Sequence, residues 1–132
     1  MRTSVVVVDR DPIILSLFQE FLSRKGYDAL LLHEPAFCEM YGNPFRECEG
    51  GCCADILIME HTISNIELLQ KQAVDGCRME RGNKAMLSLF PIGAKANANS
   101  WLGCEWFEKP FLLGEIAAWL EKCETRLQKC EG

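Results

Sequence analysis

Three apolar runs in this chain stop at charged residues of both signs. If the runs are parallel strands, their carboxyl ends meet at one edge of a sheet, where the ligands of open α/β sheets bind. Carboxylates and cations gathered in one crevice can pair with each other, or a carboxylate there can act as a nucleophile. Whether Glu60 does chemistry or only fills space would then decide the function. The residues concerned are Asp9 and Arg10 after residues 5–8, Glu60 after residues 56–59, and Lys109 with Pro110 after residues 106–108.

The apolar runs alternate with segments of helical pattern. Residues 5–8 are four valines, a run that is typical of a strand buried on both faces. Asp11-Pro12 then supplies an N-cap and a first helical residue, and Lys25-Gly26 ends the helix. Ser64 is expected to cap a later helix, with Glu67 completing a weak capping box. Further strands are expected at residues 29–32, 55–60, 85–90 and 104–108, helices at 65–74, 94–102 and 112–129, a short helix at 35–41, and an irregular loop at 42–53.

This order of elements predicts five repeats of strand then helix. Such alternation implies right-handed crossovers between parallel strands, and hence a doubly wound α/β fold with three layers, α/β/α. The 132 residues suit one domain, and no internal repeat, low-complexity tract or linker divides them. We therefore expect a single domain over residues 1–132.

Composition argues against several classes of protein. The formal net charge of −5 disfavours a nucleic-acid platform, which usually shows a basic patch. No segment approaches the ~18 consecutive apolar residues of a membrane span, and the N-terminus lacks the pattern of a signal peptide. A cytoplasmic location is therefore expected, in which the eight cysteines stay reduced.

The polar strand ends and the motif at residues 103–111 (Gly-Cys-Glu-Trp-Phe-Glu-Lys-Pro-Phe) resemble the receiver domain of two-component response regulators, the CheY-like fold. The resemblance covers nearly the whole chain, with its best matches at residues 5–9, 11–26, 55–58 and 103–111. It implies a flavodoxin-like sheet of five parallel strands in the order 2-1-3-4-5. It also implies a signalling module whose catalysis is limited at most to phosphotransfer onto itself.

In that family, two adjacent acids after the first strand bind Mg²⁺, and an Asp that ends the third strand accepts a phosphoryl group from a histidine kinase. A hydroxyl and a lysine that end the fourth and fifth strands bind the phosphoryl oxygens, and an aromatic residue reports activation. The resemblance therefore implies Asp9, Glu60 and the backbone carbonyl of Thr62 at the metal, and Glu60 at the phosphoacceptor position. It also implies Ser88 and Lys109 at the phosphoryl oxygens, and Ser88 and Trp106 in the switch.

Two departures from the family pattern change what the site is expected to do. Arg10 replaces the second acid, which removes a metal ligand and weakens the expected Mg²⁺ site. Glu60 replaces the phosphoacceptor Asp, and its extra methylene adds roughly 1.5 Å of reach, which displaces the oxygen from the in-line position. A bidentate pair of Arg10 with Glu60 or Asp9 would offset the charge that Mg²⁺ otherwise offsets. Glu60 is also expected to be within reach of Lys109 and Ser88.

These departures favour an atypical receiver, a pseudo-receiver that is not phosphorylated in the usual way and rests near an activated-like state. It would act by protein–protein interaction, with a histidine kinase or another signalling protein as partner. A downstream effector would bind through the fourth helix, the fifth strand and the fifth helix. Two alternatives are a dead site in which Glu60 is a neutral relic, and a functioning receiver that accepts phosphate with altered geometry.

Four cysteines around the loop at residues 42–53 raise a third alternative, a redox or metal sensor on a receiver scaffold. Cysteine thiolates bind Zn²⁺ or an iron–sulfur cluster, although the spacing of these four fits no standard ligand motif. His33 lies near them, and His61 follows Glu60, where it is either a solvent-facing loop residue or a phosphorylation site or general base. The cysteines in question are Cys38, Cys48, Cys52 and Cys53.

Overall fold

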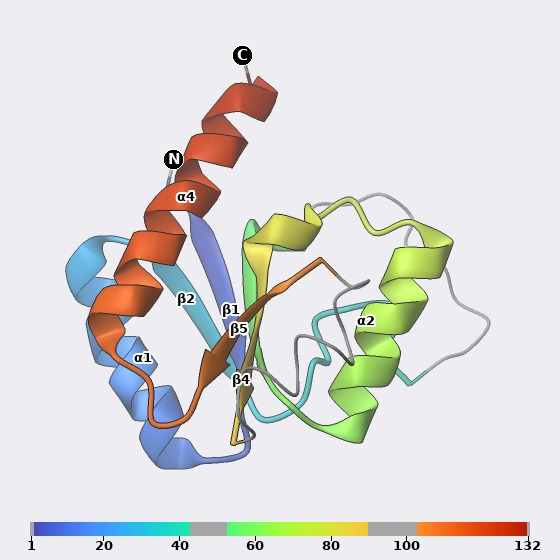
Figure 1. Cartoon of the computed structure of the whole chain (residues 1–132), viewed down its shortest axis with the longest axis horizontal. Coiled ribbons are helices and arrows are strands. Elements are labelled where there is room, and N and C mark those ends of the chain that lie inside the picture. Colours follow the sequence, from blue (N-terminus) through green and yellow to red (C-terminus); the bar gives the residue numbers. More distant parts are fainter. Residues whose placement is uncertain (1, 43–52, 90–102, 132) are drawn as a thin grey trace.

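The computed structural model of the chain describes residues 2–42, 53–89 and 103–131 (Figure 1). Its five strands form one parallel sheet in the order β2-β1-β3-β4-β5, which confirms the predicted topology. The elements in chain order are β1 (Ser4–Val8), α1 (Pro12–Lys25), β2 (Asp28–Leu32), β3 (Ile56–Glu60), α2 (Ile63–Asp75), the 3₁₀ turn η1 (Arg81–Asn83), β4 (Lys84–Ser88), β5 (Glu105–Glu108) and α4 (Leu113–Glu131).

Helices lie on both faces of the sheet, so the three-layer α/β/α prediction is confirmed (Figure 1). Alternate residues of a strand point to opposite faces, and the valines of β1 therefore serve two cores. One core lies under α1 and α4 and includes Phe18 and Ile116, each 0% exposed. The other lies under α2 and includes Leu57 and Leu68. Burial on both faces explains why β1 is an unbroken apolar run.

Capping residues set the start and end of α1 as the sequence predicts. The carboxylate of Asp11 accepts a hydrogen bond from the backbone N–H of Ile13 at 2.9 Å. Gly26 ends the helix with a φ of 86°, a left-handed conformation that glycine adopts without steric cost. None of the helices within the described ranges is both long and apolar enough to cross a membrane.

The cap of α2 differs from the prediction. Thr62, not Ser64, is the N-cap, and its hydroxyl accepts a hydrogen bond from the N–H of Asn65 at 3.1 Å. The helix therefore begins at Ile63, and Ser64 lies exposed within its first turn. The side-chain amide of Asn65 also donates to the carbonyl oxygen of Glu60 at 2.8 Å. The bond from Asn65 to Glu60 ties the helix start to the end of β3, two residues before the cap Thr62.

The short helix expected at residues 35–41 is wrong, because residues 33–42 form a series of bends and turns. Its backbone hydrogen bonds run from Cys38 to Pro35 and from Tyr41 to Cys38, three residues apart rather than the four of an α-helix. Cys38 and Met40 turn into the core beneath α2. The expected helix at 94–102 and nearly all of the loop at 42–53 fall outside the described residues.

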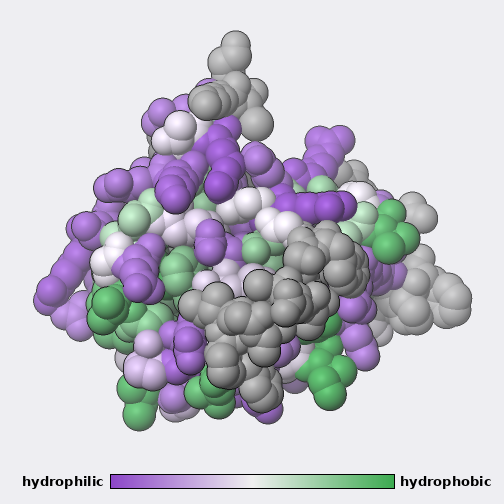
Figure 2. All heavy atoms as spheres, in the orientation of Figure 1, coloured by the Kyte–Doolittle hydropathy of each residue, from purple (hydrophilic) through white to green (hydrophobic). Residues whose placement is uncertain are grey.

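Most of the large apolar side chains that stay exposed in the described part of the chain lie at the carboxyl edge of the sheet. Figure 2 shows hydrophilic groups over much of the visible face and apolar patches along the lower edge, where the loops that follow the strands lie in Figure 1. The exposed residues that follow strands or open helices at this edge are Ile13, Ile63, Leu89 and Leu112.

Candidate functional site

The sheet brings the charged strand ends together at one edge. Its hydrogen-bond ladder continues for one residue beyond three strands, as Asp9 N–H donates to Leu32, His61 N–H to Leu87 and Lys109 N–H to Ser88, at 3.0, 2.7 and 2.6 Å. The backbone of these residues is therefore held in the register of the sheet. This geometry builds the crevice that the sequence predicts at the carboxyl ends of the strands.

Arg10 and Glu60 form a two-point ion pair at the mouth of the crevice. The Nε of Arg10 lies 3.0 Å from Oε1 of Glu60, and its Nη2 lies 3.4 Å from Oε2. The backbone N–H of Arg10 donates to the same Oε1 at 3.2 Å. The Glu60 side chain is 16% exposed and that of Arg10 is 73% exposed. The sequence predicts a pair of Arg10 with either Glu60 or Asp9, and the guanidinium hydrogen-bonds Glu60.

A second ion pair lies deeper in the crevice. The Nζ of Lys109 lies 2.9 Å from Oδ2 of Asp9, whose side chain is completely buried. The other oxygen of Asp9 accepts a hydrogen bond from the backbone N–H of Asp11 at 2.9 Å. Lys109 also lies 3.9 Å from Oε2 of Glu60. Glu60 therefore lies near both Arg10 and Lys109, and it contacts Arg10 more closely. The peptide bond between Lys109 and Pro110 is cis.

The surroundings of the Glu60 carboxylate shift its pKa. Burial alone would raise that pKa, but hydrogen bonds from the side chain and backbone of Arg10, with the charges of Lys109 and Arg10, lower it below its usual value. The hydrogen bond to Glu60 likewise raises the pKa of Arg10. Both groups are therefore charged at neutral pH. Arg10 with Glu60 and Lys109 with Asp9 thus form two ion pairs side by side.

Ser88 and Trp106, the predicted switch residues, are brought together by a histidine. The Nδ1 of His61 lies 3.0 Å from the hydroxyl oxygen of Ser88. The rings of His61 and Trp106 also form a T-shaped contact, with centroids 5.3 Å apart and planes at 89°. This role for His61 is not predicted by the sequence, from which a solvent-facing loop residue, a phosphorylation site or a general base is expected. Strand alternation is the signal that could have found it, because His61 stands two residues after the core residue Met59.

The side chains in the crevice do not fit Mg²⁺, which prefers several oxygen ligands and retains its waters. The carboxylate of Asp9 is committed to Lys109 and that of Glu60 to Arg10. The guanidinium of Arg10 adds a positive charge that repels a cation. Within residues 2–42, 53–89 and 103–131 no group of three or more His, Cys, Asp or Glu side chains could hold a metal ion. The backbone carbonyl of Thr62, which the resemblance implies at the metal, accepts a hydrogen bond from the N–H of Ile66 at 3.0 Å, and the Thr62 side chain caps α2.

The predicted cysteine cluster is only partly described. Cys48 and Cys52 lie outside the described residues, and Cys53 is exposed. Cys38 is buried beneath α2, where its sulfur accepts a hydrogen bond from the amide of Gln72 at 3.4 Å. This contact is typical of a core thiol. His33 is exposed.

Two other cysteines are poorly suited to act as thiolates. Burial raises the pKa of Cys104 to about 11 and that of Cys123 to about 12. At neutral pH both groups are therefore protonated thiols, which are weak nucleophiles.

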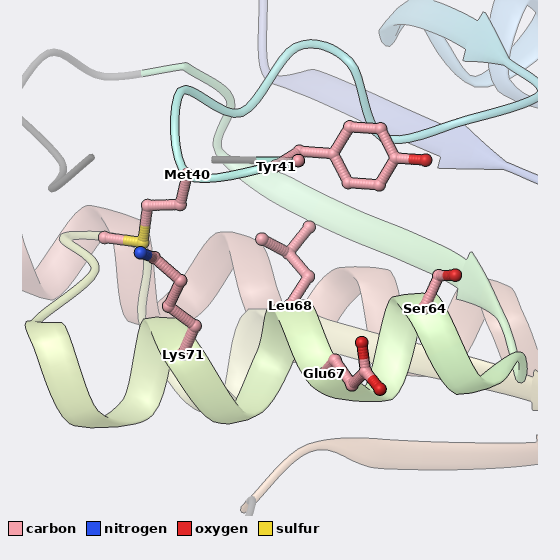
Figure 3. Close-up of a pocket in the computed structure, with 7 residues that line it drawn as sticks. Met40, Tyr41, Ser64, Glu67, Leu68 and Lys71 are labelled. Atoms are coloured by element: carbon pink, nitrogen blue, oxygen red, sulfur yellow. The ribbon is translucent and has the colours of Figure 1, made fainter. Parts of the chain in front are cut away.

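Two hollows flank the N-terminal part of α2. One, of about 470 Å³, lies between this helix and the turns before residue 43 (Figure 3). Figure 3 shows Tyr41 extended over the helix, on which Leu68 lies between Glu67 and Lys71. None of the predicted site residues lines it. The other, of about 760 Å³, opens beside the crevice and is lined by Arg10, His61, Thr62, Ile63, Ser64, Ile66, Glu67 and Gln70.

The sequence matches no protein-family model and no curated protein. Its structure is similar to solved receiver domains over nearly its whole length. A signal receiver domain of an HD domain-containing protein from Pseudomonas fluorescens Pf-5 shares 17% identity over 98% of this chain and 99% of its own, with a TM-score of 0.71. A CheY-like response regulator receiver domain protein from Methanospirillum hungatei JF-1 shares 17% identity over 100% of both chains, with a TM-score of 0.68.

An orphan response regulator of H. pylori is 12% identical over 93% of this chain and 98% of its own, with a TM-score of 0.64. At such low identities the similarity establishes the fold and leaves the chemistry to the residues of this chain. The fold is that of the response-regulator receiver domains, a CheY-like, flavodoxin-like sheet.

Proposed function

We propose that this chain is an atypical receiver domain, which acts in two-component signal transduction by protein–protein recognition and is not phosphorylated in the usual way. The observation that carries the proposal is the two-point pair between Arg10 and Glu60. The pair lies at the carboxyl edge of the sheet, and the resemblance of the sequence to receivers implies the second acid and the phosphoacceptor at these two positions.

A nucleophilic carboxylate must present a lone pair to the incoming phosphorus atom and have a cation nearby to offset the phosphoryl charge. In this crevice both oxygens of Glu60 accept hydrogen bonds from Arg10. The longer side chain also carries its oxygens beyond the position of an aspartate. Phosphotransfer to Glu60 would have to break the pair, which opposes the reaction.

The same pair supplies part of what phosphorylation supplies elsewhere. A fixed guanidinium replaces the charge of Mg²⁺, and the Glu60 carboxylate replaces part of the phosphoryl charge, 3.9 Å from Lys109. A phosphoryl group carries more charge and more acceptor oxygens than a carboxylate, so the mimicry is partial. The proposed resting state is one near the activated form, held by residues rather than by a modification.

Protein partners suit the surface of this fold. The expected effector face combines the segment at 94–102, which lies outside the described residues, with β5 and α4. The exposed apolar side chains at the carboxyl edge, Ile13, Ile63, Leu89 and Leu112, add surface that a protein partner would bury. A histidine kinase or another signalling protein is the proposed partner.

Incubation with acetyl phosphate, or with beryllofluoride, in the presence of Mg²⁺ tests the proposal. Intact-mass spectrometry should show no phosphoryl adduct, and ¹⁹F NMR should show no bound beryllofluoride. A stoichiometric adduct that maps to Glu60 or Asp9 would instead establish a functioning receiver with altered geometry. The same samples should keep their thermal unfolding midpoint when Mg²⁺ is added.

A further inference from the structure

Three side chains form a row across adjacent strands next to the crevice. Ser88 ends β4, Trp106 lies on β5, and His61 follows β3 by one residue. The imidazole of His61 contacts both others, with Nδ1 3.0 Å from the Ser88 hydroxyl oxygen and its ring in a T-shaped contact with the Trp106 indole. The row therefore leads from the edge of the crevice to the outermost strand of the sheet.

Strand register explains why these side chains face the same way. Met59, Met86 and Trp106 pack in the core beneath α2, and Met86 is paired with Trp106 across β4 and β5. His61 and Ser88 stand two residues beyond Met59 and Met86, so they lie on the same face of the sheet. The N–H of His61 donates to the carbonyl of Leu87 at 2.7 Å, which fixes the backbone on which the ring stands.

We propose that His61 is a positioning residue that couples the Ser88 hydroxyl to the Trp106 indole. Through it, a change in the orientation of Ser88 reaches β5 without a phosphoryl group in the crevice. The inference deepens the proposed function, on which its regulatory meaning rests, because it names the route by which the site and the effector face influence each other.

The physical basis is that one planar ring makes both contacts. An imidazole has two main torsions, and the hydrogen bond between Nδ1 and the Ser88 hydroxyl and the T-shaped contact with Trp106 constrain them together. Ser88 is only 1% exposed, so its hydroxyl cannot exchange His61 for bulk water without a local rearrangement. If the imidazole turns to keep its hydrogen bond when the Ser88 hydroxyl moves, its contact with the Trp106 ring therefore changes as well.

The hollow of about 760 Å³ beside α2 gives this row an opening to the surface. Both His61 and Arg10 line it. A molecule or side chain that entered it would contact the ring that couples Ser88 to Trp106 and the guanidinium that binds Glu60. Events at this hollow would therefore reach the crevice and β5 at once.

A double-mutant cycle read by NMR tests the coupling. The ¹H–¹⁵N signal of the Trp106 indole, assigned with Trp106→Phe, is recorded for the wild type, Ser88→Ala, His61→Ala and the double variant. We expect Ser88→Ala to shift this signal in the wild-type background, and the shift to be at least about twofold smaller in the His61→Ala background, because coupled neighbours are non-additive. Ser64→Ala, which removes an exposed hydroxyl from the neighbouring helix, should leave the signal unchanged.

His61→Phe separates coupling from simple packing. It keeps a ring against Trp106 but has no nitrogen for Ser88, so it should retain a packed indole that no longer responds to Ser88→Ala. If His61→Ala does not fold, the His61→Phe background carries the same cycle. Equal shifts from Ser88→Ala in all backgrounds would show that the strands, not His61, carry the effect and would overturn the proposal. Neither Mg²⁺ nor beryllofluoride enters this test, so its outcome is distinguishable from that of the phosphorylation test.

Discussion

The Nε of Arg10 lies 3.0 Å from Oε1 of Glu60, and the two residues are fifty positions apart in the chain. In the proposed atypical receiver each stands where the receiver pattern has an acid, and together they form one ion pair. The pair explains why neither replacement leaves an unbalanced charge at the crevice mouth. It also implies that the two positions should be changed together when their chemistry is tested.

Restoring both acids should restore a metal site. In Arg10→Asp/Glu60→Asp the guanidinium is gone and an additional short carboxylate faces Asp9, a donor set that suits Mg²⁺. We expect Mg²⁺ binding and a beryllofluoride adduct from this variant, measured by calorimetry and ¹⁹F NMR.

The matched control for charge is Arg2→Asp, at an exposed pair with Asp28 far from the crevice edge. It should not gain Mg²⁺ binding. If the double variant binds no more Mg²⁺ than this control, the crevice lacks the receiver geometry and the interpretation of Arg10 and Glu60 is wrong.

The ion pair of Glu60 should make stability depend on pH in one direction. The pKa of Glu60 in the folded protein is lowered from its ordinary value of 4.5, so the folded state favours the carboxylate. Its contribution is full above about pH 4.5 and is lost as the pH falls through the lower folded pKa. Glu60→Gln should therefore be less stable than the wild type at pH 7, and the difference should shrink below pH 4.5.

Urea unfolding of both proteins from pH 7 to pH 3 measures this difference. The comparison cancels the titration of all carboxylates that the two proteins share. A difference that grew as the pH fell would contradict the assigned direction of the Glu60 pKa.

Removing Lys109 should destabilise the protein because Asp9 is completely buried. Lys109→Met keeps the length of the side chain but leaves a buried carboxylate without its cation, a loss of about 3 kcal/mol. Asp9→Asn/Lys109→Met should be more stable than Lys109→Met, since no charge is then left unpaired. Lys122→Met, at an exposed position on α4, should change the unfolding free energy by less than about 0.5 kcal/mol. If Lys109→Met and Lys122→Met had equal free energies of unfolding, this result would argue against the Asp9–Lys109 pair.

The two candidate caps of α2 should differ in their contribution to stability. Thr62→Val removes the hydroxyl that accepts the Asn65 N–H and should cost about 1 kcal/mol. Ser64→Ala changes an exposed residue inside the first turn and should stay within about 0.5 kcal/mol of the wild type. Chemical denaturation of the pair decides between them, and the reverse order would favour the cap that the sequence alone predicts.

Local patterns in the sequence predicted the elements that depend on local rules. The valines of β1 indicated a strand buried on both faces, and Asp11 and Gly26 marked the ends of α1. The predicted cap at Ser64 was wrong, and residue type alone does not reveal this because Thr62 is also of a type that caps helices. The bond from the Asn65 side chain to the Glu60 carbonyl, at the start of α2, depends on how the helix is placed on the sheet.

By itself, the sequence determined the order of strands and helices and the kinds of charge at the carboxyl edge, because periodicity and residue type are local properties. Only the tertiary structure decided which side chains contact each other at that edge. Strand register brought Arg10 to Glu60 and Lys109 to Asp9, and it set His61 between Ser88 and Trp106. Such contacts join residues far apart in the chain, so local patterns do not predict them. Shifts of a few ångströms in these side chains would decide whether the carboxylates bind basic side chains or a metal ion.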